Sequence, residues 1–130
     1  VRCFSLPSNS RVMTMSVASE GTSTNYVCDV GVYLAGGNHD GAVVDSNLFG
    51  AITPSTSITS EAGEFGLDIF ETGALNAEDR GDPLWHQCAV GGGSDTVDPR
   101  VNYDICLTST TTLITAVENV QLWCTYTAGG

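Results

Sequence analysis

The residues that could do nucleophilic or metal chemistry in this sequence are its histidines and cysteines. The chain has two histidines and five cysteines: His39, His86, Cys3, Cys28, Cys88, Cys106 and Cys124. No two cysteines have the C-x-x-C spacing that zinc sites usually use, and no G-x-S-x-G elbow is present. His86 and Cys88 are two residues apart, a spacing at which helical side chains point in different directions. We therefore expect no metal, no other cofactor and no catalytic site.

Two weaker patterns support the same expectation. Residues 36–41 partly match a calcium loop, but Gly36 stands where the first aspartate belongs and Asn47 where the bidentate glutamate belongs. A polar turn between strands explains this segment better. The carboxylate pair Glu78 and Asp79 could in principle do acid–base work. Nothing in its surroundings distinguishes it from solvated loop charges.

The cysteines leave two interpretations open. Cys28, Cys106 and Cys124 fall in strand-like runs and can be small buried hydrophobic residues. One or two disulfides would instead indicate an oxidising compartment. Because the spacing suits no metal and the runs have a buried face, we predict that most of the thiols are reduced and buried.

The charge of the chain is strongly one-sided. Fifteen acidic residues stand against four arginines and no lysine, which gives a net charge of -11. Such a surface repels phosphate backbones and anionic lipid headgroups. We therefore expect neither nucleic acid nor a membrane as a partner, and no apolar run approaches the ~20 residues of a membrane-spanning helix.

The elements that would carry these residues are mostly strands. Runs of alternating apolar residues predict strands at Arg11–Ala18, Tyr26–Leu34, Asn102–Thr108 and Val120–Thr127. The faces predicted to be buried carry Met13, Met15 and Val17; Cys28, Val30, Val32 and Leu34; Tyr103, Ile105 and Leu107; and Val120, Leu122, Cys124 and Tyr126. Further strands are predicted at Thr110–Val117 and at Val1–Leu6.

Helical structure is predicted in at most two short pieces. Asp82 followed by Pro83 resembles a helix start, with Asp82 as the capping residue, and Gly91 begins the glycine run that ends the helix. Residues 45–49 are expected to form a single turn, and the Ser/Thr-rich residues 53–60 a loop or an edge strand.

Many short strands with glycine-rich turns indicate an all-β fold, either an antiparallel β-sandwich or a jelly-roll-like barrel, with one or two short helical turns. The 130 residues predict one β-rich domain over 1–130, and an alternative interpretation makes residues 1–10 a flexible N-terminal segment. Trp123 lies on the face of its strand opposite Leu122, so something is expected to cover it. Trp123, together with Phe4 and Leu6 of the N-terminal segment, is our candidate for an interface.

Five short motifs, in their order along the chain, resemble those of small virion proteins of tailed phages. They are Asp29–Tyr33, Asp40–Asp45 with Phe49, Pro83–Trp85, Tyr103–Thr108, and Leu122 with Tyr126 and Gly129. The resemblance runs from about Tyr26 to the end of the chain. The cysteines and the lack of lysine depart from the usual pattern of that group.

This resemblance implies a structural protein that decorates or cements the outer surface of a tailed-phage capsid. It implies the major capsid protein and copies of the chain itself, as a homotrimer, as partners, and a virion assembled in the host cytoplasm as the location. It supplies no catalytic residues. The alternative is a secreted or cell-surface β-sandwich that binds a carbohydrate or a receptor, which would need paired cysteines and an exposed tryptophan beside polar loops.

Overall fold

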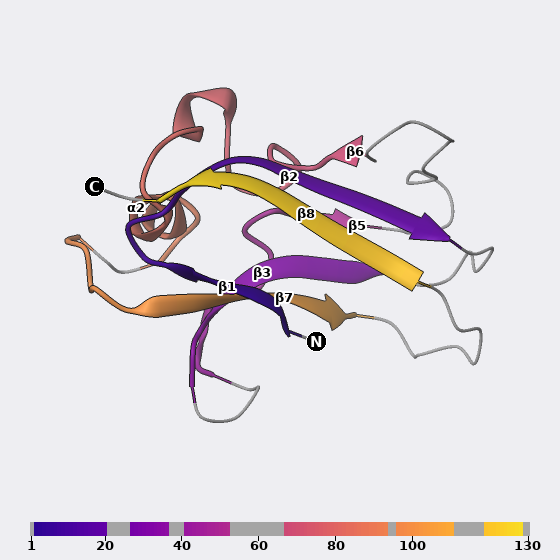
Figure 1. Cartoon of the computed structure of the whole chain (residues 1–130), viewed down its shortest axis with the longest axis horizontal. Helices are drawn as coiled ribbons and strands as arrows, with labels where there is room; N and C mark the ends of the chain where they lie inside the picture. The colour runs from indigo at the N-terminus through magenta and orange to yellow at the C-terminus, as the bar shows by residue number, and fades with distance from the viewer. Residues whose placement is uncertain are drawn as a thin grey trace.

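The chain folds into two antiparallel sheets that pack as a β-sandwich (Figure 1). The computed structural model describes residues 2–20, 27–36, 41–52, 67–93, 96–110 and 119–128. Of the two predicted arrangements, the sandwich is correct and the closed barrel is not. The predicted strand at Thr110–Val117 lies outside the described residues except for Thr110, which is not in a strand, and the loop at 53–60 lies outside them entirely.

The strands are β1 (Arg2–Pro7), β2 (Arg11–Glu20), β3 (Cys28–Leu34), β4 (Val43–Asp45), β5 (Ala51–Ile52), β6 (Leu67–Asp68), β7 (Asn102–Ser109) and β8 (Asn119–Thr127). One sheet has the order β1-β7-β3-β4, with β5 also paired to β3, and the other has the order β6-β2-β8. Strand β1 therefore ends one sheet and strand β8 ends the other.

The core lies between the two sheets because each contributes one apolar face. In β3 the alternating residues Cys28, Val30 and Val32 are fully buried, as predicted, while Leu34 at the end of the strand is 38% exposed. In β7 the predicted residues Tyr103 and Ile105 are fully buried. The helix α2 (Leu84–Val90) lies at one end of the sandwich (Figure 1).

One predicted face is wrong in part, because β2 contains a bulge. The register of β2 on β8 shifts between Val12 and Thr14, so one extra residue enters the strand. Val12, Met15 and Val17 are buried, whereas Met13, predicted to face the core, is 38% exposed. Alternation in the sequence cannot reveal a bulge. The extra residue changes which side chains face the core on one side of the bulge but not on the other.

The start of α2 also differs from the prediction. Pro83 is the N-cap residue and no side chain caps the helix, so the predicted capping role of Asp82 is wrong. The Asp82 carboxylate instead lies 3.0 Å from Nδ1 of His86, one turn along the helix. The predicted end is confirmed, because Gly91 is the C-cap residue.

A buried glutamine ties this helix to its surroundings. Gln87 is fully buried, and its Nε2 donates to the carbonyl oxygens of Val12 at 3.2 Å and of Asp79 at 2.9 Å. These bonds join α2 to β2 and to the short 3-10 helix Ala77–Asp79.

The N-terminal segment is an edge strand over most of its length. Residues Arg2–Pro7 pair with β7, as the strand interpretation predicted. The turn that follows is also held, because the backbone amide of Ser8 donates to the carbonyl of Val101 at 2.8 Å.

Candidate functional site

The most suggestive surface feature is a groove between the free edges of the two sheets. It has a volume of about 200 Å³ and is lined by Phe4, Ser5, Leu6, Leu122, Trp123, Cys124 and Tyr126. The first three belong to β1 and the others to β8, and Figure 1 shows these two strands on the same side of the sandwich. We call this feature the β1–β8 groove.

All three residues proposed from the sequence as an interface line this groove, but they differ in what they expose. Trp123 is 42% exposed and stands opposite Ser16 of β2. Phe4 is partly buried against the core. Leu6 is only 2% exposed and belongs to the core, so it forms the floor of the groove and is not a contact residue. The structure adds Tyr126, 48% exposed, which the alternation had assigned to a buried face.

Tyr126 is exposed because β8 is the last strand of its sheet. Its strand neighbours Leu122 and Cys124 point to the same side and pack partly against the core. The burial of the Cys124 thiol raises its pKa to about 11, because a thiolate loses hydration there. A side chain that enters the groove would therefore meet a neutral, mostly apolar wall.

A second apolar surface lies at the hairpin of β3 and β4. It is a hollow of about 460 Å³, lined by Leu34, Val43, Val44, Gly92, Gly93, Pro99 and Val101. On its rim, Val43 is 60% exposed and Val101 is 37% exposed. We call it the β3–β4 hollow. No local pattern in the sequence indicates this hollow, because its walls come from two parts of the chain that are distant in sequence: the β3–β4 hairpin, and the residues Gly92, Gly93, Pro99 and Val101.

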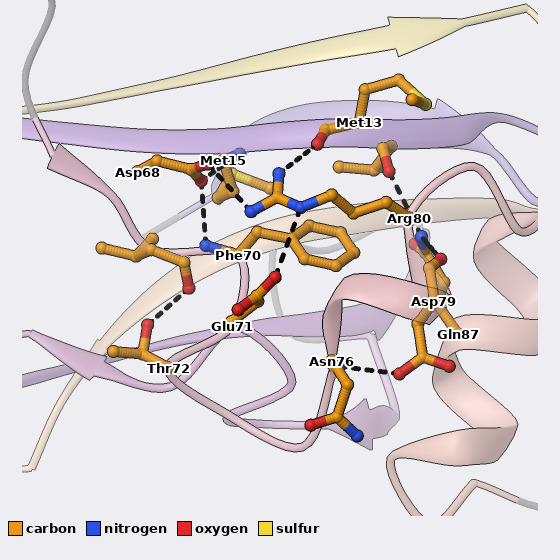
Figure 2. A network of polar contacts seen from close by, with 12 residues as sticks. Met13, Met15, Asp68, Phe70, Glu71, Thr72, Asn76, Asp79, Arg80 and Gln87 are labelled. Carbon is orange, nitrogen blue, oxygen red and sulfur yellow. Dashed lines mark hydrogen bonds and ion pairs between the residues drawn. The ribbon is translucent and has the colours of Figure 1, made fainter.

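The densest cluster of charged groups surrounds Arg80 (Figure 2). Its guanidinium donates to the carbonyl of Met13, lies 2.9 Å from Asp68 and 3.6 Å from Glu71, and stacks over Phe70 with 4.4 Å to the ring centre. Each of the three guanidinium nitrogens of Arg80 thus has a partner within the fold, and the arrangement joins β2 to the segment that follows β6. These contacts give the cluster a structural role, because they connect elements that strand pairing does not join.

A buried carboxylate on β7 is a second polar feature that the alternation did not predict. Asp104 is 1% exposed and accepts a hydrogen bond from the Ser5 hydroxyl, while the guanidinium of Arg2 lies 3.9 Å away. It lies in the middle of a central strand of its sheet, and Cys106 on the same face is 5% exposed. Ser5 and Arg2 belong to β1, so Asp104 anchors this edge strand to β7.

The histidine and cysteine candidates do not assemble into a site within the part of the chain that the structure describes. His86 has 47% of its side chain exposed, whereas Cys88 is 1% exposed, so the two point apart as predicted. Among the described residues, no group of three or more His, Cys, Asp or Glu side chains is placed to hold a metal ion. No helix in the described ranges is long and apolar enough to cross a bilayer.

The thiols fit the first of the two interpretations. All five cysteines are described and none is in a disulfide; Cys28, Cys88 and Cys106 are buried, Cys124 is half-buried and Cys3 is exposed.

The sequence thus indicated Phe4 and Trp123, two partly exposed residues that line the β1–β8 groove. It could not show that the two lie close together. They are more than a hundred positions apart and belong to different sheets. Comparison of this chain with protein-family models, with curated proteins and with solved structures finds no match.

Proposed function

We propose that this chain is a structural binding protein that decorates or cements the outer surface of a tailed-phage capsid. The observation that carries the proposal is that exposed apolar side chains gather at two separate surfaces, the β1–β8 groove and the β3–β4 hollow. Apolar clusters that water covers in an isolated chain are typical of contact sites. The choice of a phage head rests on the resemblance of the five ordered motifs.

A protein on a shell needs contacts of two kinds, with the shell and with its own copies. Linked copies bind more firmly than single ones, because each bound copy raises the local concentration of the next contact. We assign the β1–β8 groove to contacts between copies and the β3–β4 hollow to the shell. A net charge of -11 supports the outward placement, because like charge keeps assembled particles apart.

The test is sedimentation of the purified chain with phage shells that lack it. We expect the wild-type protein to pellet with the shells, and Val43→Glu to bind about tenfold more weakly or worse, because it places a charge at the rim of the β3–β4 hollow. Val97→Glu is the matched control, since Val97 is 72% exposed but does not line the hollow. It should bind like the wild type. A wild-type protein that stays in the supernatant would refute the proposed function.

A further inference from the structure

We propose that the free edge of β8 pairs with the same edge of a second copy, so that two chains share one continuous sheet. The inference rests on the proposed self-association and names the strand that carries it. Within the described residues, β8 is bonded on one side only, to β2. The backbone groups of its other edge are therefore available to a further strand.

The two free edges on this side of the sandwich differ in how they are protected. Natural proteins block edge strands with charges, prolines and bulges. Strand β1 has all three: it starts at Arg2, its register shifts between Arg2 and Phe4, and it ends at Pro7. Strand β8 is longer, with nine residues, and contains no proline and no charged residue. Its register with β2 is regular from Asn119 to Thr125.

The absence of charge on β8 favours a second copy as the partner. The chain has fifteen acidic residues, so most of its surface repels another copy of itself. Two β8 strands can meet without any contact between like charges. The exposed Trp123 and Tyr126 lie on this strand, and each would lose contact with water when the second strand is added.

The register that pairs the whole strand is centred on Trp123. Two antiparallel copies of one strand are related by a twofold axis, and Asn119–Thr127 overlaps completely only when Trp123 faces its own copy. Gln121 then faces Thr125 of the second copy, on the same outer face as Trp123. On the inner face, Leu122 faces Cys124 of the second copy. Polar residues thus face polar ones and apolar residues face apolar ones.

This pairing also completes the β1–β8 groove. The inner side chains Leu122, Cys124 and Tyr126 form one wall of the groove, and a strand added to β8 brings a second set of the same side chains beside its opening. On the outer face, Trp123 of the second copy would lie beside Trp123 and cover part of its exposed side chain. The edge predicts a dimer, whereas the resemblance to phage virion proteins implies a trimer.

Two double variants test the register. Gln121 and Thr125 are both exposed, so charges there should leave the single chain folded. In Gln121→Glu/Thr125→Glu, each glutamate faces a glutamate of the other copy, and like charges directly opposite each other are destabilising. We expect the dissociation constant to rise about tenfold or more. In Gln121→Glu/Thr125→Lys, opposite charges face each other, and the dimer should persist.

The readouts are the molar mass from light scattering and the dissociation constant from sedimentation velocity, with circular dichroism to check folding. The wild type should have twice the 13.6 kDa mass of one chain. Asn9→Glu/Thr96→Glu adds two glutamates at exposed positions that belong neither to β8 nor to the β1–β8 groove, and this variant should remain a dimer. A monomeric or trimeric wild type, or equal masses for the two β8 variants, would overturn the inference. Shell binding is measured separately, so a monomer that pellets with shells refutes the strand pairing alone.

Discussion

At the scale of single residues, the clearest chemical consequence of the fold concerns the thiols. Desolvation of the thiol raises the pKa values of Cys106, of Cys124 and of Cys3, although the Cys3 residue as a whole is exposed; for Cys124 the pKa rises to about 11. In each case the main cause is that the thiolate would lose its hydration. These cysteines are thus poor nucleophiles at neutral pH, which agrees with a structural role.

These raised pKa values predict how stability depends on pH. Below the ordinary thiol pKa of 9.0, all three thiols are protonated in the folded and the unfolded chain. As the pH rises further, the unfolded chain releases its thiol protons first, so the free energy of unfolding falls between about pH 9 and pH 11. Urea denaturation at about pH 8 and pH 10.5 should show this fall, and Cys124→Val should reduce it. A variant with the full wild-type fall would show that Cys124 makes no contribution.

At the scale of elements, contacts made by single side chains connect segments that are not paired as neighbouring strands. Gln87 joins α2 to β2 and to the 3-10 helix, and Arg80 joins β2 to the segment after β6 (Figure 2). Strand β6 has only two residues, so strand pairing alone holds it weakly. The Arg80 guanidinium bonds both to Asp68 of β6 and to the Met13 carbonyl of β2, and so adds to the few backbone hydrogen bonds that a two-residue strand can make.

Arg80→Ala should therefore lower the free energy of unfolding by about 1 to 3 kcal/mol, because it leaves the Met13 carbonyl and Asp68 without this donor. Arg80→Lys should recover only part of the loss, since an ammonium group cannot reproduce the planar fork or its stacking on Phe70. Urea denaturation measures both. Arg100→Ala is the control: it removes the same charge from an exposed position and should change stability by less than about 0.5 kcal/mol. Equal effects at the two arginines would contradict the structural role of Arg80.

At the scale of the whole molecule, the charge decides which partners are possible. With four arginines, no lysine and a net charge of -11, the protein has few cations to displace counterions from a phosphate backbone and a surface that repels it. The same charge opposes close contact between copies, so that contacts can form only at surfaces with few charges. The β1–β8 groove and the β3–β4 hollow are lined by uncharged residues.

We therefore predict no binding to duplex DNA at physiological salt. A mobility-shift titration with up to about 100 µM protein should leave the DNA unshifted, because non-specific DNA binding is almost entirely electrostatic. Lowering the salt should not produce a shift either, since weaker screening strengthens the repulsion. A complex that forms at low salt and disappears as salt is added would contradict this prediction.

The sequence by itself determined the all-β class, the main strands and the buried faces of β3 and, in part, of β2 and β7. Alternation with a period of two is a local property, and it identified Val30, Val32, Tyr103 and Ile105 as core residues. It failed at Met13, where a bulge reverses the face, and it did not predict the burial of Asp104. In both cases the burial of the residue depends on how its strand pairs with the neighbouring strands, and the alternation within one strand carries no information on that pairing.

The sequence also indicated Trp123 as an outward residue and Phe4 as a candidate contact, but only the tertiary structure decided what they form. Which strands end the sheets depends on pairing between distant segments, and that pairing left β1 and β8 as edges on the same side. The free edge of β8, the groove beside it and the β3–β4 hollow all arise from this arrangement. Local alternation identifies the buried face of a regular strand, whereas bulges and the order of strands in the sheets decide the exceptions and determine which exposed residues meet.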